Sequence, residues 1–307
     1  MYSGPVPQMR LKVVRAPALS LALAALASAC AEQPGSEMAP TGVAAEVTAP
    51  AIVIAAGDIS GCAHFYKDQE TADMVAGMPG TILPLGDLVY QNGTRWQFKN
   101  CYDPTWGPLR SRSRPTPGNH EYRTDQAGPY YEYFGERAGP PGKGYYTYTL
   151  GTWRIYSLNS ERDIPAQTKW LRRELNNNPS KCVLAYWHKP YYTSGPVPPT
   201  PALRPLFHEL WRAKAEVVLS GHQHSYERFE PQDADSNYRK RGVRQFVIGT
   251  GGAQLERPTG PMAKHSKVHY VEGWGVLELT LDTEKYSWRF VPIPGSPQAD
   301  SGSAKCV

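Results

Sequence analysis

Two histidines separated by one residue, His222 and His224, lie in residues 220–228, directly after the apolar run 216–219. The β-branched residues of this run predict a buried strand, and an extended backbone beyond it would direct both imidazoles to the same side. A neutral imidazole is a common ligand of zinc, iron and manganese. For this segment taken alone, a solvated loop that happens to carry two histidines is the alternative interpretation.

The same arrangement recurs upstream, where polar side chains follow other strand-like runs. Asp58, Asp87 and His188 each come after an apolar run, and Asn119 and His120 follow a weaker strand signal. Because the carboxyl ends of strands in an α/β protein converge on one crevice, we expect these side chains to lie together. A single aspartate in such a place can simply cap the next helix. Five such loops favour a shared site instead.

Asp87 and Tyr90 indicate how this site would divide its charge between two cations. A carboxylate binds two cations with its two oxygens, so Asp87 is the natural bridge. Tyr90 offers a phenolate, a hard anionic ligand that suits trivalent iron. Asp58, Asp87 and a phenolate supply about three negative charges, whereas Asn119 supplies a neutral carbonyl and leaves the second ion more Lewis acidic. Two metal ions about 3.5–4 Å apart can polarise a phosphoryl oxygen, deprotonate water and clamp an in-line displacement.

With these residues, the chain resembles the calcineurin-like metallophosphoesterases, specifically their purple acid phosphatase branch. Five segments follow the family order: GD at 57–58, GDLVY at 86–90, GNHE at 118–121, AYWH at 185–188 and GHQHSYER at 221–228. The second and last segments are the most specific, whereas GD or GNH alone would be weak. The resemblance implies a two-sheet αββα sandwich of the metallophosphoesterase type.

The resemblance also implies a ligand set for each of two metal ions. It assigns an iron ion to Asp58, Asp87, Tyr90 and His224. It assigns zinc, manganese or iron to Asp87, Asn119, His188 and His222. His120 matches the family's catalytic non-ligand histidine, which contacts the phosphate together with Asn119 and protonates the leaving-group oxygen. A structural hydrogen bond made by a loop histidine is the alternative for His120.

Two departures from the family pattern matter for the site. Ser60 stands where many members have a histidine ligand, and Tyr90 replaces that ligand in the purple phosphatase manner. Residues 189–195 lack the histidines that contact substrate in plant-type relatives. Tyr191 is therefore expected to contact substrate, with Tyr192 or His269 as alternatives.

Tyr226 and Arg228, in the last of these segments, are expected to brace the histidine loop without touching substrate. Arg228 would pair with a carboxylate behind the metal ions and so fix ligand orientation.

The N-terminus has the features of an export signal. Arg10, Lys12 and Arg15 precede a short apolar run at 18–27, and small residues follow up to Cys30. Residues 26–30 resemble a lipoprotein box, which would anchor the protein through a lipid on Cys30; cleavage and release is the alternative. We expect a signal peptide at 1–29, a disordered tether at 30–50 and one catalytic domain at 51–307, located in the periplasm or outside the cell.

Net charge bears on the class of ligand, and the cysteines bear on disulfide formation. The formal net charge is +5, and removal of residues 1–29 takes away three positive charges and leaves about +2. This charge does not indicate nucleic-acid binding, so we expect a small phosphorylated substrate. Cys62, Cys101, Cys182 and Cys306 suggest two disulfides in an exported protein, with three pairings open.

The periodicity of the remaining residues predicts alternating strands and helices. Strands are expected at 51–56, 81–85, 182–187, 216–219 and 244–252, a hairpin at 145–159, and an antiparallel pair at 274–294. Helices are expected at 68–77, 94–100, 167–177 and 203–213. This order favours the α/β class, with two sheets flanked by helices.

These predictions lead to one principal hypothesis and two alternatives. The principal hypothesis is an exported bimetallic phosphoesterase that hydrolyses phosphomonoesters with a metal-bound hydroxide. A phosphodiesterase or nucleotide hydrolase on the same metal centre is the first alternative. A metal-stabilised binding protein without turnover is the second.

Overall fold

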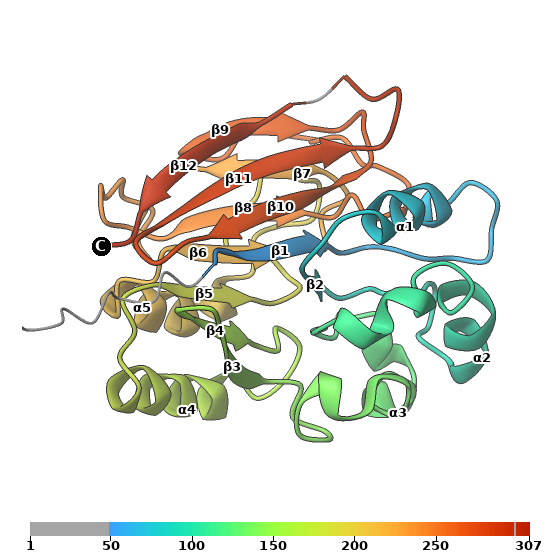
Figure 1. Ribbon diagram of the computed structural model, residues 1–307, viewed down its shortest axis with the longest axis horizontal. Helices are drawn as coiled ribbons and strands as arrows, with labels where there is room; N and C mark the ends of the chain where they lie inside the picture. The colour runs from blue at the N-terminus through green and yellow to red at the C-terminus, as the bar shows by residue number, and fades with distance from the viewer. Residues whose placement is uncertain (1–48, 298) are drawn as a thin grey trace, which may run out of the picture. The chain divides into compact units, whose positions relative to one another are not determined.

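The computed structural model describes residues 49–297 and 299–307, which group into one compact unit (Figure 1). The predicted signal peptide at 1–29, the lipid anchor at Cys30 and nearly all of the tether at 30–50 lie outside the described residues. Among the described residues, no helix is long and apolar enough to cross a membrane.

The described strands form two sheets. The first has the order β12-β11-β10-β1-β2, with β1 at Ala51–Ala56, β2 at Thr81–Pro84, β10 at Gly275–Leu281, β11 at Lys285–Pro292 and β12 at Ser301–Lys305. The second has the order β3-β4-β5-β6-β8-β7-β9, with β3 at Tyr146–Leu150, β4 at Trp153–Ser157, β5 at Val183–Tyr186, β6 at Val217–Ser220, β7 at Tyr226–Phe229, β8 at Arg244–Ile248 and β9 at Ser266–Tyr270. β1 and β2 are parallel, and so are β4, β5, β6 and β8. Loops that leave the carboxyl ends of these strands therefore start from common edges.

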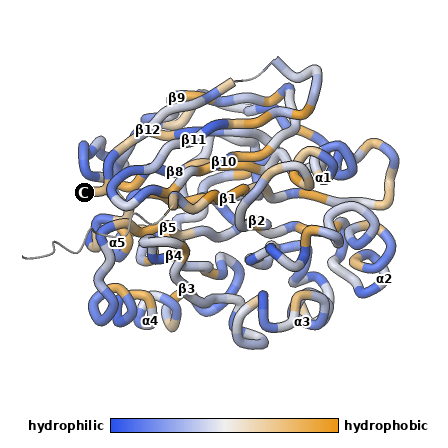
Figure 2. Tube along the Cα trace, viewed as in Figure 1, coloured by the Kyte–Doolittle hydropathy of each residue, from blue (hydrophilic) through white to orange (hydrophobic). Residues whose placement is uncertain are grey.

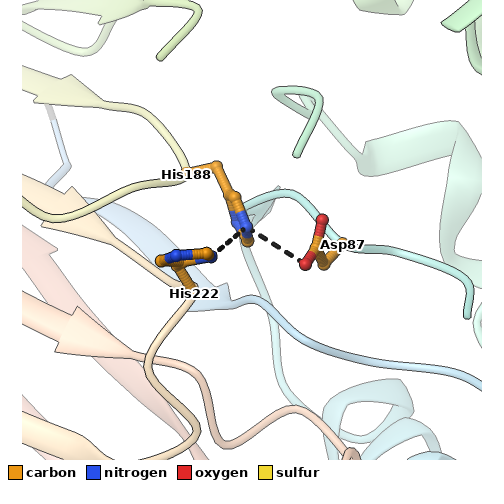
Figure 3. Close-up of side chains that lie close together, drawn as sticks. All are labelled: Asp87, His188 and His222. Atoms are coloured by element: carbon orange, nitrogen blue, oxygen red, sulfur yellow. Dashed lines mark hydrogen bonds and ion pairs between the residues drawn. The ribbon is translucent and has the colours of Figure 1, made fainter. Parts of the chain in front are cut away.

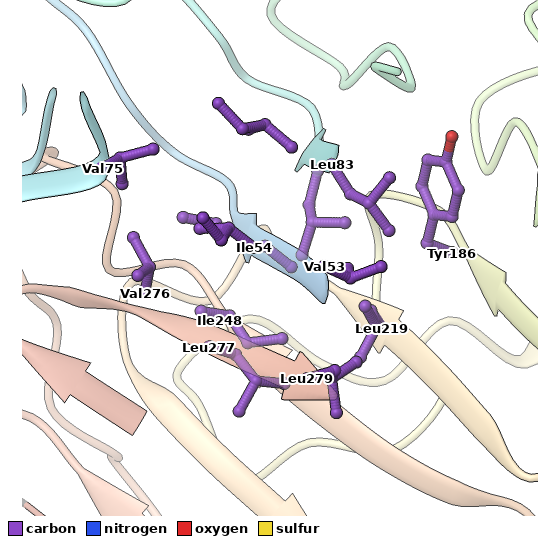
Figure 4. Close-up of a cluster of buried hydrophobic side chains, with 14 of the residues drawn as sticks. Val53, Ile54, Val75, Leu83, Tyr186, Leu219, Ile248, Val276, Leu277 and Leu279 are labelled. Atoms are coloured by element: carbon purple, nitrogen blue, oxygen red, sulfur yellow. The ribbon is translucent and has the colours of Figure 1, made fainter. Parts of the chain in front are cut away.

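The two sheets bury one continuous core between them. Leu83 of β2 and Leu277 of β10 belong to the same buried cluster as Leu219 of β6 (Figure 4). Consecutive residues Val53 and Ile54 of β1 are both fully buried, so this strand is covered on both faces. Figure 2 shows the hydrophobic residues concentrated along the inner strands, as burial on both faces requires.

The described helices are α1 (Asp68–Ala76), α2 (Arg95–Gln97), α3 (Gly128–Phe134), α4 (Ile164–Asn177) and α5 (Arg204–Arg212). Leu171 of α4 and Leu206 of α5 pack with Ala185 of β5 and Val218 of β6 in a second buried cluster. α4 and α5 therefore cover the outer face of the second sheet. The arrangement is the predicted α/β fold with two sheets flanked by helices.

Short π-helical and 3-10-helical segments also lie between β2 and α5. They are the π-turn Phe98–Tyr102 and the 3-10 turns Gly107–Arg112, Glu121–Arg123, Asp125–Ala127, Gly135–Ala138 and Pro201–Leu203. The strands and helices predicted from periodicity are present, with shifts of a few residues. The periodicity did not predict α3, β7, β9 or β12.

Both expected disulfides form, and the structure settles their pairing. Cys62 is joined to Cys101, with Cα atoms 4.9 Å apart, and Cys182 to Cys306, with Cα atoms 5.4 Å apart. The first bond ties the loop after β1 to the π-turn, and the second ties the start of β5 to the end of the chain. Two disulfides are consistent with an extracellular protein.

Candidate metal centre

The loops after β1 and β2 run side by side where they carry the predicted ligands. Asp58 N–H donates to the Gly86 carbonyl at 3.1 Å, and Ile59 N–H donates to the Asp87 carbonyl at 3.0 Å. Asp58, Asp87 and His222 have left-handed backbone conformations, with φ of 60°, 49° and 71°. Such conformations are costly for residues with a Cβ atom and gather at functional sites, where the surrounding structure holds them.

Asp58, Tyr90 and His224 lie together and form what we call the tyrosine cluster. The Tyr90 hydroxyl donates to Asp58 Oδ1 at 2.9 Å and lies 2.9 Å from His224 Nε2. His224 Nε2 is 3.4 Å from Asp58 Oδ1. His224 Nδ1 donates to the Gln254 carbonyl at 2.7 Å, because a carbonyl can only accept. In the neutral imidazole, Nε2 therefore presents its lone pair to the cluster.

Asp87, Asn119, His188 and His222 form a second group, the histidine cluster, part of which Figure 3 shows. His188 Nε2 lies 3.2 Å from Asp87 Oδ2, 3.2 Å from Asn119 Oδ1 and 3.1 Å from His222 Nδ1. His188 Nδ1 donates to the Leu85 carbonyl at 2.8 Å, which leaves the lone pair of Nε2 facing these atoms. Several acceptor atoms converging on one point fit a cation.

The electrostatics of the histidine cluster agree with this fit. Burial alone would lower the pKa of His188, but the Asp87 carboxylate raises it to about 10. Burial and the neighbouring His188 lower the pKa of His222 to about 3. His188 thus carries a proton on Nε2 toward Asp87 in the absence of a cation, and a cation that displaces this proton would meet the Nε2 lone pair in its place.

The tyrosine cluster contains a carboxylate and a phenol, but the phenol is protonated in the absence of a cation. Burial raises the pKa of Tyr90 well above its ordinary value, and the Asp58 carboxylate raises it further. The phenol therefore keeps its proton unless a cation is beside it. Burial would lower the pKa of His224, but its hydrogen bond to Asp58 raises it to about 9. The donor set fits a cation here too.

The two oxygens of Asp87 have different partners, and its bridging role stays a prediction. Asp87 Oδ1 accepts the backbone N–H of His120 at 2.8 Å, whereas Oδ2 lies 3.2 Å from His188 Nε2. A carboxylate oxygen that accepts one hydrogen bond keeps a second lone pair, so either oxygen of Asp87 can still bind a cation. Asp58 divides its oxygens in the same way, because Oδ2 accepts the backbone N–H of His222 at 2.7 Å. Each carboxylate thus fixes a neighbouring loop with one oxygen.

A protein-family model identifies the family of the chain. The family model described as calcineurin-like phosphoesterase matches residues 50–226, more than half of the chain. The chain belongs to the calcineurin-like phosphoesterase family. Probable purple acid phosphatase 20 of Arabidopsis thaliana is 30% identical over 201 residues, which cover 56% of this chain and 44% of that protein. Purple acid phosphatase 15 of the same plant is 24% identical over 235 residues, which cover 61% of this chain and 43% of that protein. The chain therefore matches less than half the length of these relatives.

Solved structures share the fold at lower sequence identity. Purple acid phosphatase PPD1 from yellow lupin (Lupinus luteus) seeds superimposes with a TM-score of 0.72 and 18% identity, over 84% of this chain and 54% of that chain. GAP50, the anchor in the inner membrane complex of Plasmodium, superimposes with a TM-score of 0.64 and 13% identity, over 84% and 90% of the two chains. These likenesses confirm the predicted fold class.

His120 lies beside the histidine cluster of the phosphoesterase. Its Nε2 is 3.7 Å from Asp87 Oδ2, and its Nδ1 donates to the Gln91 carbonyl at 2.6 Å. The imidazole therefore stands between the cluster and Gln91, with its Nε2 lone pair on the side of the cluster. Burial lowers the pKa of His120, although Asp87 opposes this effect. This position suits the predicted contact with a phosphate.

A cavity of about 500 Å³ opens next to His120, and we call it the site cavity. Its walls include Tyr90, His120 and His224 from the site itself. Its other walls, which include Phe65, Gln91, Arg123 and Glu256, are not among the predicted site residues. They lie on loops and short turns without a periodic signal in the sequence. Only the position of Arg123, three residues after His120, offered a hint in the sequence.

Glu121 is a second residue whose role the sequence analysis did not assign. It is fully buried, and its carboxylate accepts the backbone N–H groups of Asp87 and Leu88, both at 2.9 Å, and of Gly118 at 2.8 Å. Burial and the nearby Asp87 raise its pKa to about 7. Glu121 thus holds together the loops that carry Asp87 and Asn119. Its place directly after GNH was the available signal.

The structure gives Tyr191 a packing role in place of the predicted substrate contact. Tyr191 is buried in the second core cluster, where its ring lies 5.0 Å from that of Phe207, and its hydroxyl donates to the Ala234 carbonyl at 2.8 Å. The Tyr192 hydroxyl donates to a backbone carbonyl as well. His269, the other alternative, has Nε2 3.1 Å from the hydroxyl oxygen of Ser225.

Tyr226 and Arg228 are structural, but their partner differs from the predicted one. Both lie on β7, and both contact Asp300, the residue before β12. Arg228 Nε donates to Asp300 Oδ2 at 2.7 Å, and the Tyr226 hydroxyl donates to the same oxygen at 2.6 Å. The carboxylate paired with Arg228 is thus in the C-terminal segment and belongs to neither cluster. The pair fixes β7 against the first sheet.

Proposed function

We propose that this phosphoesterase hydrolyses phosphomonoesters at a centre of two metal ions. Iron would bind at the tyrosine cluster, and zinc, manganese or iron at the histidine cluster. The adjacency of two complete donor clusters is the observation that carries the proposal. Asp58 of one cluster accepts the backbone N–H of His222 of the other at 2.7 Å. Two bound cations would supply Lewis acidity, which polarises phosphoryl oxygens and activates water.

The roles of the residues follow from their positions. Asp58, Tyr90 and His224 would hold one ion and the histidine cluster the other, with Asp87 shared between them as the resemblance implies. His120 and Asn119 would position the phosphoryl group. Because Gln91 holds His120 Nδ1, proton transfer to a leaving oxygen would take place at His120 Nε2.

The proposal includes export to the periplasm or beyond the cell, which the two disulfides support. The lipid anchor at Cys30 remains a prediction.

The test compares hydrolysis of 4-nitrophenyl phosphate and bis(4-nitrophenyl) phosphate by the purified protein from acid to alkaline pH, with Asp87→Ala as the control. We expect the monoester to be the better substrate and its hydrolysis to be lost in the variant. Dominant cleavage of the diester would move the assignment to a phosphodiesterase. No turnover by protein that carries two metal ions would favour a binding protein.

A further inference from the structure

The site cavity contains one arginine, Arg123, whose placement the proposed phosphatase chemistry does not use. Arg123 ends the 3-10 turn Glu121–Arg123, which starts directly after His120. Residues three apart lie on the same side of a 3-10 turn, so the two side chains project together. The Gln91 carbonyl accepts from both of them, from His120 Nδ1 at 2.6 Å and from Arg123 Nη1 at 3.1 Å. The guanidinium is thus held at a fixed place beside the imidazole.

The His120 side chain lies between the Arg123 guanidinium and the histidine cluster. His120 Nε2 is on the cluster side, 3.7 Å from Asp87 Oδ2, whereas Arg123 approaches Gln91 on the Nδ1 side. The imidazole ring therefore separates the guanidinium from Asp87. A phosphoryl group at the clusters would meet His120 first, and Arg123 would meet whatever part of the substrate lies next in the cavity.

The charge of Arg123 is available to a ligand. Among the described residues, its only hydrogen-bond partner is the Gln91 carbonyl, and no carboxylate forms an ion pair with it. A guanidinium carries five N–H donors in a planar fork that matches a carboxylate or a phosphate. Glu256, on the same cavity, would repel an anion, so an anion would bind on the Arg123 side.

We propose that Arg123 is a specificity residue that selects phosphomonoesters with a second anionic group, a carboxylate or another phosphate, a few bonds from the scissile ester. This inference rests on the proposed function, because it assumes that the phosphoryl group lies at the two clusters. Arg123 acts on the leaving group, and the clusters and His120 act on the transferred phosphoryl group.

The test uses two substrates that differ only in the second charge. 3-Phosphoglycerate and glycerol 3-phosphate share the phosphoester and the carbon chain, and a carboxylate in the first replaces a hydroxymethyl group in the second. We expect kcat/KM to be about tenfold higher for 3-phosphoglycerate, the effect of one charge-assisted pair at a part-exposed site. Arg123→Gln should reduce this ratio to about one and change kcat/KM for glycerol 3-phosphate by less than about twofold.

Two further variants separate charge from geometry. Arg123→Lys keeps the charge without the fork and should retain part of the preference. Arg95→Gln removes an arginine that pairs with Glu132 outside the site cavity, and it should leave the ratio unchanged. Equal loss on both substrates in Arg123→Gln would mean that Arg123 serves the transferred phosphoryl group, and the inference would fall.

A binding measurement separates this inference from the proposed function. Calorimetry with 2-hydroxy-4-phosphonobutanoate and 3,4-dihydroxybutylphosphonate, the non-hydrolysable counterparts of the two substrates, reports the preference without turnover. Tighter binding of the carboxylate compound, lost in Arg123→Gln, would support the inference even if neither substrate were hydrolysed. The proposed function would be overturned separately, by the absence of 4-nitrophenyl phosphate hydrolysis in protein that carries two metal ions. Equal binding of both phosphonates by the unmodified protein would overturn the inference alone.

Discussion

The tyrosine cluster and the histidine cluster are neighbours, yet they offer different donors. The first combines the Asp58 carboxylate, the Tyr90 phenol and one imidazole, and its His224 lines the site cavity. The second combines one carboxylate, one amide oxygen and two imidazoles around the fully buried His188. The tyrosine cluster can become strongly anionic and borders the cavity, whereas the histidine cluster has a single carboxylate and keeps Asn119 and His222 partly exposed.

Under the proposed function, the difference would let one site distinguish two cations. Burial and Asp58 raise the pKa of Tyr90 well above the ordinary value, so only a strongly charged ion would displace its proton. Neutral imidazoles and an amide oxygen suit a divalent ion of borderline character. The selection would then come from the donors of each cluster, with Asp87 as their predicted connection.

The largest effect is expected from Asp87→Ala, which removes the carboxylate that is predicted to bind both metal ions. We expect both metal ions to be lost and kcat/KM on a phosphomonoester to fall by about a thousandfold or more. His120→Ala is the matched variant: it should keep both ions and lower turnover by about a hundredfold. Elemental analysis of the purified proteins measures the metal content. Two equivalents of metal in Asp87→Ala would show that Asp87 does not bridge the clusters.

Tyr90→Phe should weaken metal binding at the tyrosine cluster and leave binding at the histidine cluster unchanged. The variant loses the phenolate donor, so we expect one equivalent of metal, the iron, to bind about a hundredfold more weakly while the other stays. A visible absorption band from phenolate-to-iron charge transfer should disappear with it. Tyr66→Phe is the control, because the Tyr66 ring lies 5.8 Å from that of Tyr90 and its hydroxyl is in neither cluster. Loss of both ions from Tyr90→Phe would contradict the independence of the clusters.

Glu121→Gln should weaken both clusters together, by a smaller factor. An amide has one acceptor oxygen where the carboxylate accepts from Asp87, Leu88 and Gly118. We expect metal affinity to fall by about 10- to 100-fold and the free energy of unfolding by about 2–3 kcal/mol. Chelator competition and denaturant titration measure the two effects, with the exposed Glu132→Gln as control. An unchanged metal affinity would restrict Glu121 to a purely structural role.

Glu216→Gln should have the smallest effect, on stability alone. Glu216 accepts the backbone N–H of Val183 at 2.7 Å and of Val307 at 3.1 Å, and burial raises its pKa from 4.5 to about 7. The folded state then binds the proton more tightly than the unfolded state. This contribution is complete below pH 4.5 and is lost as the pH rises to about 7.

In the native protein, this loss should amount to about 3 kcal/mol of unfolding free energy. Glu216→Gln should remove most of that slope and leave the metal content unchanged. Denaturant unfolding at a series of pH values measures it. An identical slope in both proteins would assign the pH dependence to other groups, such as Glu121.

The sequence predicted those strands and site residues that a pattern of a few neighbouring residues identifies. Apolar runs mark β1, β5 and β6 because these strands are buried on both faces, and Asp58, His188 and His222 follow them directly. The structure brings all seven predicted metal-ligand residues into two groups. Their assignment as ligands stays a prediction.

The parts that the sequence did not predict depend on distant partners. The charged residues of β7 give it the sequence pattern of a polar loop, whereas its strand conformation depends on pairing with β8 and β9 and on the contact of Arg228 with Asp300. Tyr191 sits between two site loops in the sequence, but its side chain turns into the second core. The disulfide pairing likewise depends on which strands are neighbours.

The position of β1 has a consequence for folding. β1 lies between β2 and β10, and Ala51 pairs with Leu281. This sheet therefore closes only through a contact between segments about 230 residues apart in the chain. The Cys182–Cys306 bond likewise joins residues with a sequence separation of 124. A chain without residues 275–281 would leave an unpaired apolar edge on β1 that favours aggregation.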